Sequence, residues 1–211
     1  MGWLKAFVDL DGTILSVEER CGRLFSELVG LDYADFGTRY IALRRQGLTN
    51  SEILSNSQDG FCISHDDFRR RWMERIETES FLKYDRLVEG VVPWLQSHSG
   101  DWGIILCTDR QSSEKASGQL ADFGLRNFFQ EILVTEQKVS KAELVRLRGI
   151  ELSGDDWFVG DSPGDILAGK TLGLRTCAVL SGLSGRESLE RLKPDLVVSS
   201  IDHFCPSLSE K

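Results

Sequence analysis

The stretch Ala6-Phe7-Val8-Asp9-Leu10-Asp11-Gly12-Thr13 decides the fold of this 211-residue chain. An apolar run from Trp3 to Val8 ends in two aspartates with a single residue between them, and such a run is typical of a short buried strand. Gly12 allows a tight turn and a close approach of the backbone to a ligand. Ligands of open α/β sheets bind outside the carboxyl ends of strands. The segment therefore indicates a functional site rather than the Asp-Gly turn of a hairpin.

Asp9 and Asp11 form the candidate catalytic pair of this site. They lie two residues apart at the strand end, so both side chains are expected on the same face. Two nearby carboxylates repel each other, so one tends to keep its proton while the other stays ionised. This pattern predicts a nucleophile or metal ligand at Asp9 beside a general acid/base at Asp11.

The composition predicts an ordinary soluble globular protein. The net charge of −8, without a long Lys/Arg run, argues against a nucleic-acid partner. The first apolar stretch lacks the basic region of a signal peptide, and no apolar stretch is long enough to span a membrane. The five cysteines are scattered without a Cys-x-x-Cys pair, which fits reduced thiols in a cytoplasmic location. The oligomeric state stays unknown at this stage.

Helices alone are predicted between residues 16 and 81, directly after the first motif. No strand-like run occurs there, and helical spacing covers residues 17–31, 35–45, 49–54 and 65–79. From residue 82 onward, strand-like segments alternate with helical ones. The predicted strands are 103–107, 131–134, 157–159, 176–180 and 196–198. This alternation predicts an α/β fold with a doubly wound parallel sheet. The core would comprise residues 1–15 and 82–211, and residues 16–81 would form an inserted all-helical domain.

Further polar residues follow the predicted strands at the edge where Asp9 is expected. The candidates for substrate binding after the second strand are Thr108, Asp109 and Arg110. The fourth strand is followed by Asp161 and Asp165, two carboxylates four residues apart. Carboxylates on two strand ends can hold a hard cation such as Mg²⁺, which keeps waters and shares substrate phosphate oxygens. A Lys and a Thr would neutralise and orient the remaining phosphate oxygens.

These motifs resemble those of the haloacid dehalogenase (HAD) superfamily of aspartate-nucleophile phosphatases. The matching elements are Asp9-Leu10-Asp11-Gly12-Thr13, Thr108, a lysine within residues 138–141, and Gly160-Asp161-x-x-x-Asp165. The helical insert is similar to the helical cap of the phosphoglycolate-phosphatase-like branch. The resemblance implies a Rossmann-like HAD core with an inserted cap.

The resemblance also implies a Mg²⁺-dependent phosphatase acting on a small phosphorylated metabolite. Asp9 would attack phosphorus and form an aspartyl-phosphate, and Asp11 would protonate the leaving oxygen and then activate water. Asp9, the Asp11 backbone carbonyl and Asp161 would hold Mg²⁺. Asp165 would complete the metal site by orienting a water or the lysine.

Two departures from the family pattern concern the lysine and the residue after Thr108. Lys138 fits the spacing of the Lys-Pro-x-Pro form, whereas Lys141 fits the variant with a lysine at the helix start followed by Ala-Glu-Leu. Both remain candidates, and the second is favoured. Asp109 stands where relatives often have Asn, and its charge would repel phosphate, so it is expected to turn away.

Three rival functions on this scaffold fit the sequence less well. A β-phosphoglucomutase-like phosphomutase would have a His about twelve residues past the nucleophile, where this chain has Cys21. A haloacid dehalogenase proper would lack the carboxylate of Asp11. A non-catalytic HAD-scaffold binding protein would be expected to lose motif carboxylates, and none is missing here.

The helical insert is expected to close over Asp9 and to supply contacts to the substrate. Its hinges are predicted near residues 15–16 and 82–83, because hinges need only a few residues that absorb backbone rotation. An anionic substrate needs positive charge, so at least one arginine of the insert should face the site. The candidates are Arg20, Arg23, Arg39, Arg44, Arg45, Arg69, Arg70 and Arg71.

Overall fold

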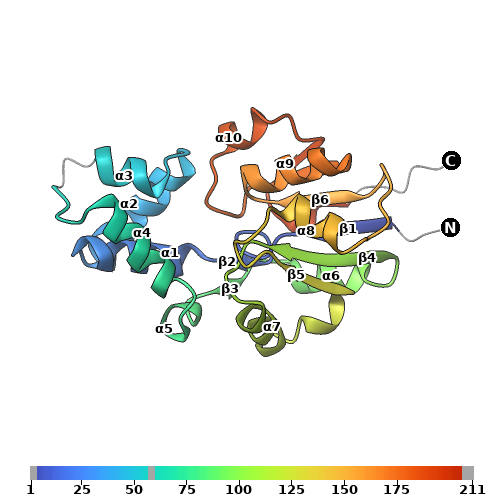
Figure 1. Ribbon diagram of the computed structural model, residues 1–211, viewed down its shortest axis with the longest axis horizontal. Coiled ribbons are helices and arrows are strands. Elements are labelled where there is room, and N and C mark those ends of the chain that lie inside the picture. Colours follow the sequence, from blue (N-terminus) through green and yellow to red (C-terminus); the bar gives the residue numbers. More distant parts are fainter. Residues whose placement is uncertain (1–3, 57–59, 206–211) are drawn as a thin grey trace.

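A six-stranded parallel sheet forms the centre of the computed structural model, which describes residues 4–56 and 60–205. The strand order is β5-β4-β1-β6-β7-β8, and every neighbouring pair is parallel. The strands are β1 (Leu4–Val8), β4 (Trp102–Thr108), β5 (Glu131–Val134), β6 (Trp157–Gly160), β7 (Arg175–Val179) and β8 (Leu196–Val198). The predicted doubly wound α/β fold is confirmed (Figure 1). Trp3, the predicted start of the first strand, lies outside the described residues.

Helices cover both faces of this sheet, because successive residues of a buried strand point in opposite directions. In β1, Ala6 and Val8 belong to one apolar cluster and Phe7 to another. The first cluster includes side chains of α6 (Val91–His98) and α7 (Ser113–Asp122), and the second those of α8 (Lys141–Leu147) and α9 (Pro163–Leu172). A shorter helix, α10 (Arg186–Glu190), packs Leu189 against Ile166 of α9. Each fully buried Leu, Ile or Phe stabilises such layers by roughly 1.5–3 kcal/mol.

The helical insert lies beside the sheet as a separate layer of helices (Figure 1). It contains α1 (Glu18–Val29), α2 (Tyr33–Arg45), α3 (Asn50–Asn56), α4 (His65–Arg75) and α5 (Glu79–Leu82). Phe25 of α1 is central to its core, with ring centroids 4.5 Å from Tyr40 and 5.2 Å from Phe68. The helix expected over residues 65–79 is divided into α4 and α5, and the Ser64 side chain caps α4 by accepting a hydrogen bond from the Asp67 N–H. The boundaries of the insert at residues 16 and 81 stay a prediction.

The two crossings between the sheet domain and the insert lie side by side. They form a short antiparallel ladder of β2 (Leu15–Ser16) and β3 (Arg86–Leu87). The sequence analysis did not predict this ladder, because two-residue strands are too short to show a periodicity. The first predicted hinge coincides with β2, whereas the second was expected at residues 82–83, before β3. Their action as hinges stays a prediction.

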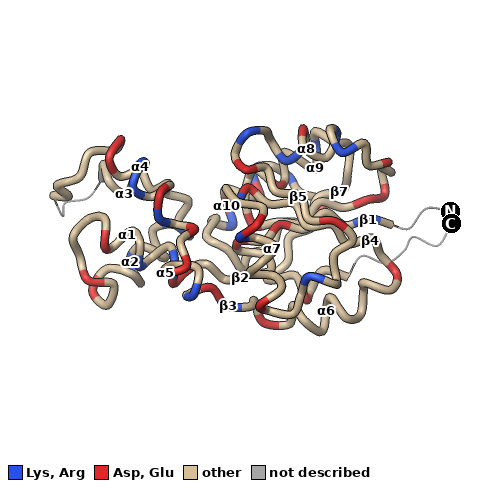
Figure 2. The backbone as a smooth tube through the Cα atoms, turned by 60° about the horizontal axis from the view of Figure 1, so that its bottom comes forward, with Lys and Arg blue, Asp and Glu red and all other residues tan. Residues whose placement is uncertain are grey.

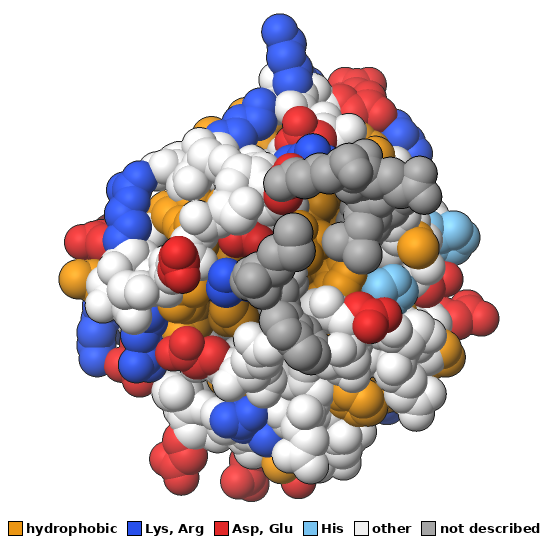
Figure 3. All heavy atoms as spheres, turned by 90° about the vertical axis from the view of Figure 1, so that its right-hand side faces the viewer, with side chains coloured by type: hydrophobic (Ala, Val, Ile, Leu, Met, Phe, Trp, Pro, Cys, Tyr) orange, Lys and Arg blue, Asp and Glu red, His pale blue; other side chains and the backbone are white. Residues whose placement is uncertain are grey.

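Charged residues of both signs are spread along both parts of the chain (Figure 2). On the face seen in Figure 3, Lys and Arg side chains are interspersed with Asp and Glu. Within residues 4–56 and 60–205, every helix is too short or too polar to cross a membrane.

Candidate active site

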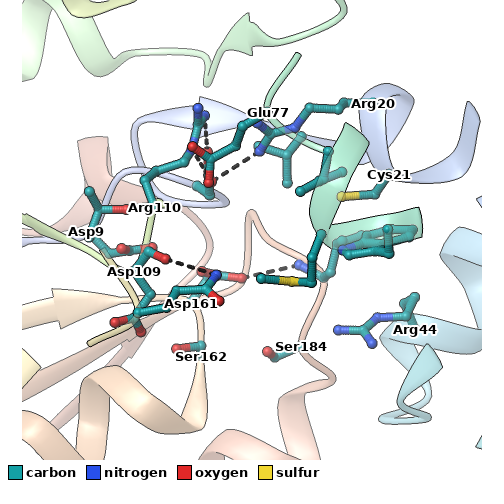
Figure 4. Close-up of a pocket in the computed structure, with 18 of the residues that line it drawn as sticks. Asp9, Arg20, Cys21, Arg44, Glu77, Asp109, Arg110, Asp161, Ser162 and Ser184 are labelled. Atoms are coloured by element: carbon teal, nitrogen blue, oxygen red, sulfur yellow. Dashed lines mark hydrogen bonds and ion pairs between the residues drawn. The ribbon is translucent and has the colours of Figure 1, made fainter. Parts of the chain in front are cut away.

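A cavity of about 320 Å³ lies between the carboxyl end of the sheet and the helical insert. Parallel strands end at the same edge, so the loops that follow them can share one site. The sheet domain contributes Asp9, Asp11, Thr108, Asp109, Arg110, Lys141, Asp161, Ser162 and Ser184 to its lining. The insert contributes Arg20, Cys21, Arg44, Trp72 and Met73, and Glu77 follows α4 (Figure 4). Most of the predicted site residues therefore meet in one cavity.

Lys141 connects the carboxylates that follow β1 and β6, namely Asp9 and Asp165. Its ammonium lies 2.6 Å from Asp9 Oδ1 and 2.5 Å from Asp165 Oδ1, and all three side chains are buried. Ser140 caps α8 and places Lys141 at its first position, as the sequence predicts. Lys138 lies on the surface with 75% of its side chain exposed and pairs with Glu136. The contacts expected of the motif lysine are thus made by Lys141.

Three buried carboxylates meet beside this lysine. Asp9, Asp161 and Asp165 each offer an oxygen within 4.8 Å of the others. Burial raises the pKa of Asp9 above its usual range and that of Asp161 to about 7, and the charge of Asp165 adds to both shifts. Burial alone would lower the pKa of Lys141, but the Asp165 and Asp9 carboxylates outweigh it and raise that pKa.

This donor set suits a hard divalent cation. When ionised, three carboxylates against one ammonium leave two negative charges uncompensated. Mg²⁺ carries the balancing charge and prefers oxygen ligands. The side chain of Asp11 lies outside the three-carboxylate group, so it could contribute to such a site only through its backbone carbonyl, as the resemblance implies.

Two glycines make room for the Asp161 carboxylate. A Cβ at Gly12, whose φ is +89°, would lie 2.4 Å from Asp161 Cγ, and one at Gly182 would lie 1.8 Å from Oδ2. The Leu183 N–H donates a hydrogen bond to that oxygen at 3.2 Å. The sequence alone predicts only a loop from Gly182 to Gly185, because glycines mark turns and loops. Its position directly after the fifth strand was the signal that could have assigned it to the site.

Asp11 is arranged differently from the expected pairing with Asp9. Arg110 donates two hydrogen bonds to it, from Nε to Oδ2 at 2.5 Å and from Nη2 to Oδ1 at 2.6 Å. Arg20 of α1 adds an ion pair at 3.0 Å. Burial would raise the pKa of Asp11, but the Arg110 and Arg20 guanidinium groups outweigh it and hold that pKa well below its usual range. Asp11 is therefore an ionised, doubly paired carboxylate rather than one that shares a proton with Asp9.

Asp85, which precedes β3, forms ion pairs with the same two arginines. Arg110 Nη2 lies 3.2 Å from Asp85 Oδ2, and Arg20 Nε lies 3.2 Å from Oδ1. Gln119 of α7 accepts from Arg110 at 3.0 Å and donates to Asp85 at 2.9 Å. Arg110, expected to bind substrate, is thus mainly committed to carboxylates within the protein. Sequence reasoning missed Asp85 and Gln119 because neither belongs to a motif.

Thr108 and Asp109 lie at the end of β4, as predicted. Thr108 is buried in the cavity wall. Asp109 has 58% of its side chain exposed, and its Oδ2 lies 4.0 Å from Lys141 Nζ. The Thr135 hydroxyl donates a hydrogen bond to its Oδ1 at 2.9 Å. Asp109 therefore lies at the rim of the cavity, held by Thr135, rather than fully turned away from it.

Comparison with known proteins places these motifs in a wider group. A family model described as haloacid dehalogenase-like hydrolase matches residues 7–179. Pyrophosphatase PpaX of Bacillus cereus (strain Q1) is 26% identical over 213 residues, which cover 96% of this chain and 94% of the relative.

Solved structures share the fold over nearly the whole length. A haloacid dehalogenase-like family protein from Streptococcus pneumoniae has a TM-score of 0.67 at 19% identity, with 93% of this chain and 94% of that chain covered. The HAD-type protein YfnB of Bacillus subtilis, whose structure contains magnesium, has a TM-score of 0.64 at 18% identity, with 96% of both chains covered.

Proposed function

Because the chain belongs to the haloacid dehalogenase-like hydrolases, we propose that it is a Mg²⁺-dependent phosphatase that hydrolyses a small phosphorylated metabolite through an aspartyl-phosphate. One observation carries this proposal most directly. A single buried lysine bridges a strand-end aspartate and a second carboxylate inside a cavity, with a third carboxylate alongside. This arrangement provides a nucleophile, a cation site and a positive charge for phosphate oxygens in one place.

The first step would be attack of an Asp9 oxygen on phosphorus, with departure of the alcohol or phosphate leaving group. Lys141 would hold Asp9 in position and stabilise the negative charge of the phosphoryl oxygens. The Thr108 hydroxyl would orient one of those oxygens. Water would then hydrolyse the aspartyl-phosphate and regenerate Asp9.

Mg²⁺ would be held by Asp9, Asp161 and the Asp11 backbone carbonyl, with Asp165 orienting Lys141. When bound, the cation supplies positive charge to the phosphoryl oxygens. This assignment is supported by the three carboxylates, which offer only oxygen ligands and carry two more negative charges than Lys141 can balance. YfnB, similar in fold, contains magnesium.

Asp11 would serve as the general base that activates water in the second step. An ionised carboxylate can accept a proton, but the pairing with Arg110 and Arg20 weakens Asp11 as a base, so that pairing would have to loosen in this step. To act as an acid in the first step, Asp11 would have to take up a proton and loosen its pairing with Arg110 and Arg20. Movement of the insert would separate Arg20 from Asp11, because Arg20 belongs to the insert, whereas Arg110 belongs to the sheet domain and would stay beside Asp11.

The alternative of a phosphomutase stays weaker. Cys21 lines the cavity where the mutase pattern has a His, and burial raises the pKa of its thiol to about 11. A buried neutral thiol cannot replace an imidazole in proton transfer at neutral pH.

The test is a phosphatase screen over phosphorylated sugars, nucleotides, short hydroxy acids and inorganic pyrophosphate, with Mg²⁺ and with EDTA. Pyrophosphate belongs in the panel because the B. cereus relative is named a pyrophosphatase. We expect at least one compound to release phosphate with Mg²⁺ and none with EDTA. Full activity after exhaustive chelation would contradict the metal assignment, and no hydrolysis of any compound would contradict the function.

A further inference from the structure

The basic side chains that line the cavity differ in their partners. Lys141 is bound to Asp9 and Asp165, and both Arg20 and Arg110 are bound to Asp11 and Asp85. Arg44 is the exception. Among residues 4–56 and 60–205, the structure gives Arg44 no carboxylate partner within 4.0 Å, and its strongest polar contact is to Asn50 Oδ1 at 3.4 Å. Its Nε is buried without a hydrogen-bond partner, as are Arg20 Nη1 and Arg110 Nη1, so the lack of a carboxylate partner is what distinguishes Arg44.

Arg44 also points into the cavity. It lies in the last turn of α2, and Figure 4 shows its guanidinium extending toward the space between the insert and the loops that carry Asp161 and Ser184. Asp9 lies across that space on the sheet side (Figure 4). The cavity thus has a reacting carboxylate at one end and an uncompensated positive charge at the other.

The position in the helix alone does not explain this orientation. A positive residue in the last turn interacts favourably with the helix dipole wherever its side chain points. The neighbouring Arg45 has that same benefit, yet its side chain is 54% exposed and pairs with Glu18. Arg44 is instead held near Asn50, which accepts a hydrogen bond from the buried Tyr40 at 2.9 Å.

We propose that Arg44 binds a second anionic group of the substrate, a carboxylate or a second phosphate, at the end of the cavity opposite Asp9. This inference rests on the proposed phosphatase function and narrows its substrates to phosphate esters or anhydrides with an additional negative charge. Arg44 is half-buried and has no carboxylate partner, and a bound anion would add charge-assisted hydrogen bonds to its weak contact with Asn50. The cavity, at about 320 Å³, is at the small end of the size range of ligand pockets, which fits a small substrate.

The experiment compares matched pairs of probe substrates. Each pair is a phosphorylated hydroxy acid and its carboxamide, with two, three or four carbons, so that only the second charge differs. The quantity measured is the ratio of kcat/KM for the acid to that for the amide. Inorganic pyrophosphate against p-nitrophenyl phosphate gives the corresponding comparison for a second phosphate, and the two arms show which anion Arg44 prefers.

Three variants and the wild type are compared. We expect the wild type to prefer the acid of at least one length, or pyrophosphate. This preference should fall at least tenfold in Arg44→Gln, mainly through KM, and recover in part in Arg44→Lys. Arg45→Gln is the matched control from the same helix turn and should keep the wild-type ratio. Circular dichroism and thermal denaturation report whether each variant is folded.

The outcomes separate this inference from the proposed function. If the wild type hydrolyses none of the phosphate compounds with Mg²⁺, the phosphatase proposal itself fails. If it hydrolyses acids and amides equally well and shows no preference for pyrophosphate, the function stands and the second-anion site is wrong. An unchanged ratio in Arg44→Gln, or an equal loss in Arg45→Gln, would also overturn it. If Arg44→Gln does not fold, the kcat/KM ratio of the wild type and that of Arg44→Lys still test the second-anion site.

Discussion

At the scale of single residues, the site is a balance of buried charges. Asp9 and Asp165 both contact Lys141, and Asp11 contacts two arginines. Buried ions are tolerated when they are paired, whereas removal of one partner leaves a charge with neither water nor counter-ion. Substitutions at these positions therefore change both chemistry and stability, and a test has to separate the two.

Asp9→Asn keeps the shape of the side chain but removes the negative charge of the proposed nucleophile. We expect kcat to fall at least about a thousandfold, equivalent to about 4 kcal/mol of barrier, while the protein stays folded by circular dichroism. Asp155→Asn is the matched control, because Asp155 is an exposed aspartate that pairs with Arg175 away from the cavity. Residual turnover within tenfold of wild type would remove Asp9 as the nucleophile.

Lys141→Met should be far more damaging than Lys138→Met. Without Lys141, Asp9 and Asp165 lose their shared counter-ion, and we expect a loss of about 3–5 kcal/mol in the free energy of unfolding together with loss of turnover. Lys138 is exposed, so its substitution should change stability by no more than about 0.5 kcal/mol. Urea denaturation and steady-state kinetics measure both effects. Comparable losses in the two variants would contradict the assignment of Lys141.

At the scale of elements, the loop from β7 to α10 is as much a part of the site as the motif strands. The Ser181 hydroxyl donates to the Gly12 carbonyl at 2.7 Å, and Leu183 N–H donates to Asp161. The loop thereby contacts the segments that follow both β1 and β6 and holds them together. Glycine at position 182 is needed because of the short approach to the Asp161 carboxylate, not because of its backbone angles.

Gly182→Ala and Gly118→Ala should have opposite effects on the free energy of unfolding. The new methyl at position 182 would overlap Asp161, so we expect lower stability and at least tenfold weaker binding of Mg²⁺ in calorimetric titration. A Cβ at Gly118, within α7, meets no atom within 4 Å. Alanine there should stabilise the helix by about 0.5–1 kcal/mol. A Gly182→Ala variant with wild-type affinity for Mg²⁺ would show that this loop does not shape the site.

At the scale of the whole molecule, charged groups join the two parts of the chain. Arg20 comes from the insert, Asp11 and Arg110 from the sheet domain, and Asp85 from the segment before β3. The cavity lies between the same two parts. Ligands that bind there are therefore expected to stabilise the assembled molecule as well as to react.

Binding of Mg²⁺ should raise the melting temperature. A ligand that binds only the folded state at a hundred times its Kd adds about 2.7 kcal/mol to the free energy of unfolding. We expect this increase with Mg²⁺, its reversal by EDTA, and its loss in Asp161→Asn, as followed by differential scanning calorimetry. Ca²⁺ and buffer alone serve as controls. An equal Mg²⁺ effect in Asp161→Asn would place the cation elsewhere.

The α/β class, the alternation of the six sheet strands with helices, and the run of helices after the first strand all follow from the sequence. Those features depend on local patterns, namely apolar runs, helical spacing and capping residues such as Ser64 and Ser140. The sequence also identified the strand ends, because carboxyl ends of parallel strands meet at one edge. The sequence therefore predicts that Asp9, Thr108 and Asp161 lie near one another.

Which side chains contact one another depends on how distant segments of the chain pack. The choice between Lys138 and Lys141, the pairing of Asp11 with Arg110, and the roles of Asp85 and Gly182 all depend on contacts between segments far apart in the chain. Whether a buried charge is ionised depends on its partners and on its distance from water, and neither is encoded in local spacing. For the same reason, the many arginines of the insert looked alike in sequence, and packing alone distinguished Arg44 from Arg45.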